Sequence, residues 1–576
     1  MMLEKRDISY YIKTILIVCL AVLIISIIVL SLVPPVSRDA LTHHLAVPKL
    51  YLKHGGIYEI PFMNFSYYPM NLDLLYLIPL YFGNDIAPKF IHFLFALLTA
   101  LLIFYYLRKR ANALFGLLGV IFFLSIPVIV KLSITVYVDL GEIFFSFASI
   151  LFILKWLRSG FRQRYLIYSG LMCGLALGTK YNGLVTLAIL TLFVPFIYSR
   201  YGEKKGRGII QPVRQCMMFL IISLLFFSPW MIRNYHWKSN PVYPLYDRLF
   251  NPRKDISSQA IPGDNDEETV KMNRGIFTYR SMIYNETGWQ IALLPIRIFF
   301  QGQDNDPQYF DGRLNPFLLL LPFFAFYGLK DDPEYLKREK KILLAFSALF
   351  FGFAFFTAVL RIRYISPLIP PLILLSVFGL INLYKIANQI SSIIFRRVCI
   401  ALVVIVMCIS LALNADYIRS QFKYVDPVPF IKGKVSRDEY IGRYIPEYPA
   451  VRYINSNLDN RARVLFILIG NRGYYCDRDY THDMDIVKSS ISRAKIPEDI
   501  SGELKKSGIT HLLIRYGLFE EWTNNNFSKE KQGLTRQFFR EHTDLLFYEN
   551  GYGVVGLSAF APASRPGGED HELARG

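Results

Sequence analysis

Residues 12–44 read IKTILIVCLAVLIISIIVLSLVPPVSRDALTHH, and this stretch decides the class of fold. Its first part, 12–33, is almost wholly apolar, and about 20 such residues in a helix are enough to cross a bilayer. The apolar run is longer than the core of a typical signal peptide, and no small-x-small cleavage pattern precedes Pro34-Pro35. We therefore expect a retained membrane helix that delivers a polar segment to the membrane surface.

Apolar stretches of the same kind recur along the chain. The 576 residues are 53% hydrophobic and 19% charged, whereas soluble domains carry about 25% charged residues. This composition excludes a soluble enzyme, a disordered chain and a fibrous protein. The stretches 69–83 and 287–301 are too short to span and are interpreted as half-spans or interfacial helices. Eleven segments meet or approach the length of a span: 12–33, 86–107, 113–130, 138–157, 165–180, 181–198, 216–232, 314–329, 342–360, 365–385 and 398–415.

The net charge of +19 is mainly a topology signal. With the N-terminus in the cytoplasm, the inner loops hold 23 Lys and Arg against 7 Asp and Glu, which accounts for +16. No basic soluble module that would bind nucleic acid stands out. We therefore predict a polytopic α-helical membrane protein with 11–13 spans, outer loops at 34–85 and 233–313, and a C-terminal region on the outer side.

The C-terminal segment has a different character. Short β-type runs at VLFIL (464–468), THLLIRY (510–516) and DLLFY (544–548) alternate with polar, helix-like stretches at 484–507 and 528–541. Alternation of this kind predicts a small α/β domain. We expect a transmembrane domain over 1–415, a periplasmic α/β domain over 416–562 and a disordered tail over 563–576.

Ionisable residues collect at the predicted outer membrane boundary, where a charge is costly and usually has a partner or a function. A carboxylate there can act as general base for an acceptor hydroxyl or amine. Lys and Arg can hold a phosphate and stabilise the charge that grows as it leaves. Together they suit transfer of a group from a phosphorylated lipid. The residues are Arg38, Asp39, His43, His44, Tyr137, Asp139, Glu142, Lys180, Arg233, Arg361 and Arg363.

Each of these residues also has a purely structural interpretation. Asp39 is equally compatible with capping a helix that begins at Ala40. Asp139 and Glu142 are equally compatible with first-turn acids that the helix dipole favours. Tyr67-Tyr68-Pro69 indicates only a loop against the membrane. The others are more often polar surface residues or interface anchors, namely His43, His44, Lys180, Arg361 and Arg363.

The order and spacing of several motifs indicate a family. They are SRDALTHHLAVPKLY (37–51), SYYPMNLDLLYLIPL (66–80), TVYVDLGEIFF (135–145), GLALGTKYNGL (174–184), PWMIRNYHWKSNPVYP (229–244) and RIRYISPLIPP (361–371). Through them nearly the whole chain resembles the GT-C glycosyltransferases, in particular the bacterial members akin to protein O-mannosyltransferases and to the lipid A aminoarabinose transferase.

The resemblance implies inverting transfer of a sugar from a polyprenyl phosphate, such as undecaprenyl phosphate, at the outer face of the bacterial inner membrane. The acceptor is a glycan, a lipid or a protein. No cofactor is implied with certainty, and a divalent cation (Mg or Mn) is compatible. The implied roles are Asp39 as catalytic base; Asp139, Glu142 and His43 as supporting or metal-binding groups; Lys180, Arg233, Arg361 and Arg363 as phosphate contacts; and Arg38, His44, Tyr67, Tyr68 and Tyr137 as the substrate loop.

Two departures from the family pattern bear on these roles. The family loop commonly has Asp-Glu where this chain has Asp39-Ala40, and Tyr68-Pro69 replaces a basic residue before the proline. The way in which the family activates its acceptor and uses a metal can therefore be carried over to this chain less directly. Two other functions share the many spans and the charges, namely a lipid-sugar flippase or transporter and a ligase or polymerase of pyrophosphate-linked glycans.

Overall fold

The computed structural model describes residues 2–202, 208–252, 275–328, 331–356 and 359–558. One compact unit runs up to Ser436 and the other starts at Arg437. The predicted domain boundary at residue 416 falls inside a helix, and the predicted tail lies outside the described residues.

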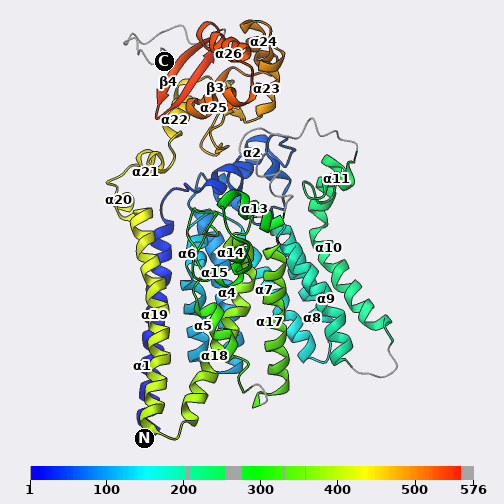
Figure 1. Ribbon diagram of the computed structural model, residues 1–576, viewed down its shortest axis with the longest axis vertical. Helices are drawn as coiled ribbons and strands as arrows, with labels where there is room; N and C mark the ends of the chain where they lie inside the picture. Colours follow the sequence, from blue (N-terminus) through cyan, green and yellow to red (C-terminus); the bar gives the residue numbers. More distant parts are fainter. Residues whose placement is uncertain (1, 203–207, 253–274, 329–330, 357–358, 559–576) are drawn as a thin grey trace. The chain divides into compact units, whose positions relative to one another are not determined.

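The first unit is an α-helical bundle (Figure 1). Apolar stretches become helices here because a backbone in lipid must satisfy its own hydrogen bonds. The helices are α1 (Met2–Ser31), η1 (Ala40–His44), α2 (Ala46–His54), η2 (Asn64–Tyr67), α3 (Asn71–Tyr81), α4 (Ala87–Arg110), α5 (Ala113–Ser125), α6 (Pro127–Ser133), α7 (Asp139–Arg158), α8 (Gln163–Thr179), α9 (Gly183–Tyr201), α10 (Ile210–Lys238), α11 (Asp247–Phe250), α13 (Gly275–Tyr284), α14 (Gly288–Ala292), α15 (Leu294–Arg297), α16 (Phe317–Phe324), α17 (Glu334–Phe355), η5 (Ile362–Leu368), α18 (Ile369–Gln389), α19 (Ile393–Val425) and α20 (Pro427–Ile431).

Fewer helices than predicted are long and apolar enough to cross a membrane by themselves. Among the described residues there are 7, or 8 if the bent pair α5–α6 counts as one span. This pair bends by 69°, because Pro127 has no N–H to continue the helix. Of the other predicted spans, α8 has only 17 residues, α16 has 8, and α17 begins with the charged sequence EYLKREKK.

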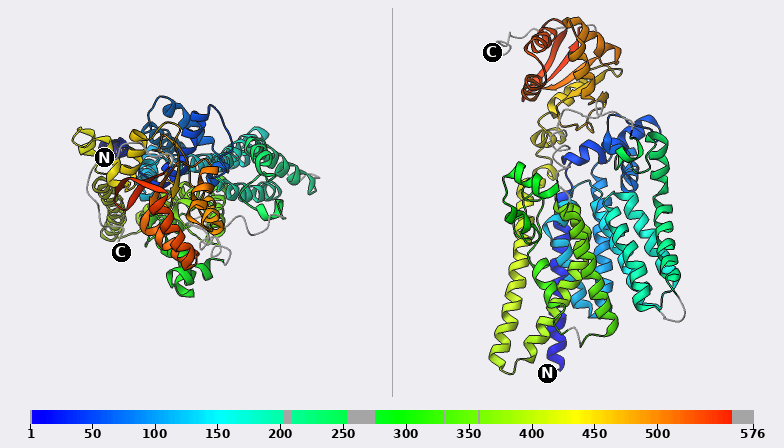
Figure 2. Two further views of the ribbon diagram at one scale, coloured as in Figure 1. Left: turned by 90° about the horizontal axis from the view of Figure 1, so that it is seen from above. Right: turned by 45° about the vertical axis from the view of Figure 1, so that its right-hand side comes forward.

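Burial separates the centre of the bundle from its edge. The apolar window that includes α18 is 89% buried, whereas the window in α19 is 6% buried. Helices α1 and α19 lie side by side at the edge, as the view from above also shows (Figure 2). Their apolar side chains therefore face outward, which is the arrangement expected for helices in contact with lipid.

The second unit confirms the predicted α/β class. Its five-stranded sheet has the order β2-β1-β3-β5-β4, with β1 parallel to β2 and β3, and β5 antiparallel to β3 and β4. Leu465, Leu512 and Val555 pack with helical side chains in its core. The elements are α21 (Arg437–Tyr444), α22 (Tyr448–Asn457), β1 (Arg463–Ile467), β2 (Asp479–Thr481), α23 (Met484–Arg493), α24 (Pro497–Lys506), β3 (His511–Arg515), α25 (Tyr516–Asn526), α26 (Lys529–Glu541), β4 (Thr543–Glu549) and β5 (Tyr552–Leu557).

Candidate functional site

The first element of the site is an ion pair between two distant segments. Asp39 immediately precedes η1, and Arg363 lies in η5, 324 residues later. Arg363 Nη1 donates a hydrogen bond of 2.5 Å to Asp39 Oδ2. The side chain of Asp39 makes no cap bond to η1. The helix-capping interpretation of Asp39 is therefore wrong, and its carboxylate is committed to a tertiary contact.

The surroundings of Asp39 keep it charged. Burial raises the pKa of a carboxyl group, but the charge of Arg363 outweighs this effect and holds the pKa of Asp39 well below its usual range. Burial and His44 in turn hold the pKa of His43 well below its ordinary value. The site thus presents a carboxylate beside a neutral imidazole at neutral pH.

A second ion pair joins the start of α7 to the turn between α8 and α9. Lys180 Nζ donates a hydrogen bond of 2.5 Å to Asp139 Oδ1, and the Asp139 side chain is only 1% exposed. The ring of Tyr364 connects the two pairs, because Lys180 Nζ and Arg363 Cζ lie 5.1 and 5.2 Å from its centroid. Four segments far apart in sequence therefore form one cluster with two carboxylates and two cations.

Aromatic and histidine side chains extend this cluster. The guanidinium of Arg363 also lies 5.2 Å from the centroid of Tyr137, and the carbonyl of Tyr137 accepts a hydrogen bond from the hydroxyl of Tyr76. His44 Nδ1 lies 2.7 Å from Asp73 Oδ1, with both side chains buried. Sequence reasoning did not propose Asp73 for the site, although a carboxylate inside an apolar stretch was a usable signal.

Arg233 lies in a different environment. Its Nη2 atom donates to the carbonyls of Tyr67 and Tyr68 at 2.6 and 3.1 Å, and its guanidinium lies 4.6 and 5.0 Å from the rings of Trp230 and Trp237. These contacts hold the 67–68 turn in place. A phosphate contact for Arg233 stays a prediction, and Arg38 is exposed.

Arg361 faces a second set of acids. Its Nη1 atom lies 3.8 Å from Asp311 Oδ2, and Lys131 Nζ lies 3.1 and 3.3 Å from Asp311 Oδ1 and Asp304 Oδ1. Burial raises the pKa of Asp311, but Lys131 overcomes this and lowers it. The acids were missed because the polar segment 303–312 carries no local pattern that separates them from ordinary loop residues.

Glu142 is the most isolated acid near the cluster. It is 0% exposed, and neither of its carboxyl oxygens has a hydrogen-bond partner among the described residues. An unpaired ionisable side chain in a spanning helix is expensive and is therefore a candidate for a function. Within the described ranges no group of three or more His, Cys, Asp or Glu could hold a metal ion. A role for a divalent cation stays a prediction.

Comparison with known proteins identifies a family model that matches part of the chain. Residues 75–232 match the family model of dolichyl-phosphate-mannose-protein mannosyltransferase, a range that includes Asp139 and Lys180 but not Asp39 or Arg363. A search of curated proteins found no match.

Two crystal structures of ArnT from Cupriavidus metallidurans are similar in fold to nearly the whole chain. For ArnT in the apo state the TM-score is 0.55 at 13% identity, over 96% of this chain and 99% of that chain. For ArnT bound to undecaprenyl phosphate it is 0.54 at 14% identity, over 95% and 99%. Likeness at such identities concerns the fold. The resemblance inferred from the motifs is confirmed to this extent: the chain is a multi-span membrane protein with the fold of the GT-C glycosyltransferases.

Proposed function

We propose that this protein is a glycosyltransferase that moves a sugar from a polyprenyl phosphate to an acceptor at the outer face of a bacterial inner membrane. The observation that carries the proposal is the cluster in which the Asp39 carboxylate pairs with Arg363, while Arg363 and Lys180 both lie over the ring of Tyr364. It brings together a carboxylate that can accept a proton and two cations that can bind a phosphate. The fold shared with ArnT, which binds undecaprenyl phosphate, supports the choice of donor.

The chemistry follows from the charges in this cluster. Asp39 accepts the proton of an acceptor hydroxyl or amine, whose lone pair attacks the anomeric carbon. The bond from that carbon to the phosphate oxygen breaks, and the lipid phosphate leaves with one additional negative charge. Lys180 and Arg363 stabilise this charge. A single displacement without a covalent sugar–enzyme step inverts the anomeric carbon.

The Asp39–Arg363 pair couples donor binding to the strength of the base. In the free protein, the charge of Arg363 stabilises the carboxylate and makes it a weak base. A donor phosphate that binds Arg363 shares its positive charge. Asp39 then binds a proton more readily, at the time when the acceptor must lose one.

Replacing Arg363 with Gln tests this coupling through the pH profile. Arg363 lowers the pKa of Asp39, so its loss lets burial raise that pKa. The base is then protonated at a higher pH, and activity should fall earlier as the pH is lowered. We expect the acidic limb of the kcat/KM profile to move to higher pH in Arg363→Gln. An acidic limb at the wild-type position, with activity merely scaled down, would contradict the coupling.

Replacing Lys180 with Gln tests the phosphate contact. The amide can still donate a hydrogen bond to Asp139, but the positive charge is lost. We expect kcat/KM for the lipid donor to fall about 10²–10³-fold, as for loss of one group that stabilises the leaving charge. The matched control is Lys155→Gln, since Lys155 lies at the other end of α7, over the ring of Tyr165. Equal donor kinetics in both variants would rule out the role of Lys180.

The activity itself is tested by following the lipid product. The purified full chain in nanodiscs is given polyprenyl-phosphate-linked hexoses and pentoses with glycan, lipid and peptide acceptors, and the released lipid is identified by mass spectrometry. We expect free polyprenyl monophosphate. Release of pyrophosphate from a pyrophosphate-linked glycan would favour a ligase or polymerase, and transbilayer movement without cleavage would favour a flippase.

A further inference from the structure

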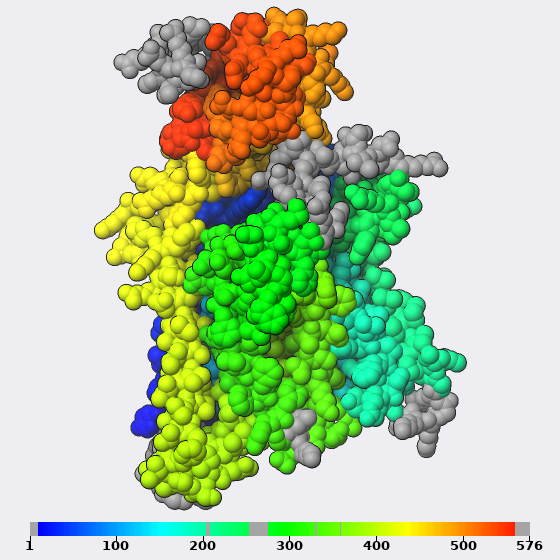
Figure 3. All heavy atoms as spheres, in the orientation of Figure 1, coloured from blue at the N-terminus to red at the C-terminus, as the bar shows by residue number. Residues whose placement is uncertain are grey.

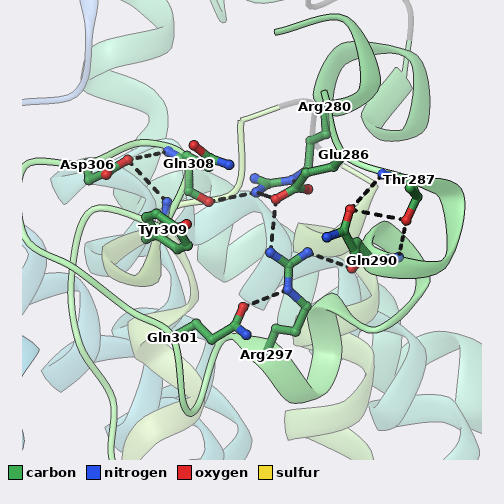
Figure 4. A network of polar contacts seen from close by, with 9 residues as sticks. All are labelled: Arg280, Glu286, Thr287, Gln290, Arg297, Gln301, Asp306, Gln308 and Tyr309. Atoms are coloured by element: carbon green, nitrogen blue, oxygen red, sulfur yellow. Dashed lines mark hydrogen bonds and ion pairs between the residues drawn. The ribbon is translucent and has the colours of Figure 1, made fainter. Parts of the chain in front are cut away.

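The segment 275–303 contains only three charged residues, and all three form one cluster. Arg280 donates from Nε and Nη2 to Glu286 at 2.6 and 2.9 Å, and Arg297 Nη2 donates to Glu286 Oε1 at 2.9 Å (Figure 4). The side chains of Arg280, Glu286 and Arg297 are 1%, 3% and 13% exposed. The charges of this segment therefore point inward.

The exposed surface of the same segment carries no charged side chain, and large apolar side chains lie there beside uncharged polar ones. Trp289 is 74% exposed and Phe300 is 55% exposed. Figure 3 shows this region, in green, on the surface of one face of the bundle. A groove between α13 and α14 is lined by the apolar Phe277, Met282 and Ile291 together with Thr278, Ser281 and Gly288. The exposed large apolar side chains are Phe277, Met282, Ile283, Trp289, Ile296 and Phe300.

Charges inside and large apolar groups outside reverse the usual order of a water-exposed surface. Several polar groups of the segment are also paired within it. Thr287 and Gln290 form a capping box at the start of α14, and Arg297 donates to the carbonyl of Gln290 at 2.7 Å. Internal pairing lowers the free-energy cost of placing this backbone in a medium that offers few hydrogen bonds.

The lengths of its helices show that this segment cannot cross a bilayer. Helices α13, α14 and α15 have 10, 5 and 4 residues, far fewer than the roughly 20 needed to cross. Exposed Trp together with apolar residues is typical of the membrane–water interface. We propose that the segment 275–300 is embedded in the interfacial layer of the bilayer, with Trp289 and Phe300 among the lipids and the groove open to acyl chains.

The segment 275–300 is also connected to the candidate functional site through hydrogen bonds. Arg280 Nη2 donates to the carbonyl of Gln308 at 2.6 Å, Ile362 N donates to the carbonyl of Phe310 at 2.8 Å, and Arg361 faces Asp311. The ion cluster thus connects the lipid-facing segment to the loop that contacts η5. The proposal concerns the partner of this surface and does not depend on the reaction catalysed.

The test uses the fluorescence of Trp289 in bilayers that contain brominated phospholipids. The chain has five Trp residues, so the signal of Trp289 is the difference between the wild type and Trp289→Phe. We expect this difference signal to be quenched more by bromines near the headgroup than by bromines near the chain ends. Trp522→Phe is the control, because Trp522 is 8% exposed in the α/β unit, and it should leave the lipid-dependent component intact.

A second variant places a fluorescent probe at another position on the same face. The exchange Phe300→Trp, introduced into Trp289→Phe, should restore quenching by headgroup-proximal bromines. If neither the native Trp289 nor the indole introduced by Phe300→Trp responds to bromolipids, the face lies in water or against protein, and the proposal is overturned. The readout needs no turnover, so its failure is distinguishable from failure of the proposed glycosyltransferase activity.

Discussion

Asp39→Asn is expected to lower kcat by about 10²–10⁴-fold, the range that a positioned general base contributes. The amide is nearly the same size as the carboxylate and can still accept a hydrogen bond from Arg363, so the local structure should persist. It cannot take up the proton of the acceptor. The measurement is initial rate under saturating lipid donor, at equal protein abundance in nanodiscs, together with donor binding.

The pattern across these measurements separates a catalytic role from a structural one. Loss of turnover with donor affinity kept within a few-fold supports Asp39 as the base. Glu334→Gln is the matched exchange of a carboxylate for an amide, at an exposed helix start outside the cluster, and should retain wild-type turnover. Wild-type turnover in Asp39→Asn would exclude Asp39 as the base.

Among the variants discussed, Glu286→Gln is expected to lower the free energy of unfolding the most. Glu286 is the acid between Arg280 and Arg297 (Figure 4), and its removal leaves two neighbouring guanidinium groups without a counter-charge. Breaking a buried pair by removing one partner costs about 3–5 kcal/mol, because the remaining charge is desolvated and unpaired. We expect a clearly lower midpoint of thermal unfolding and faster proteolysis within 275–300.

Two comparisons identify the source of that loss. Glu334→Gln breaks an exposed pair with Arg338, where the Glu334 side chain is 63% exposed, and should change stability by no more than about 1 kcal/mol. Adding Arg280→Gln to Glu286→Gln removes one of the orphaned charges and should recover part of the loss. An equal effect of Glu286→Gln and Glu334→Gln would show that the cluster contributes no special stability.

Several long apolar helices and three of the five strands of the described sheet could be predicted from local sequence, whereas β2 and β5 were missed. The span at 12–33 corresponds to α1, and the runs at 464–468, 510–516 and 544–548 correspond to β1, β3 and β4. The span follows from the length of its apolar run, and the strands follow from short apolar runs that alternate with polar, helix-like stretches. Three predicted spans fell short: α8 and α16 are too short, and the first part of α17 is charged.

The sequence by itself determined that this chain enters a membrane, and it placed Asp39, Asp139, Lys180 and Arg363 at the same predicted boundary. Only the tertiary structure decided that Asp39 pairs with Arg363 and Asp139 with Lys180, that Arg233 donates to the 67–68 turn, and that Arg280, Glu286 and Arg297 turn inward. Apolar length and hydropathy are local properties, which neighbouring residues reveal. The partner of a charge depends on which distant helices pack together, and one sequence alone does not distinguish a charge that faces lipid headgroups from one that faces a counter-ion 324 residues away.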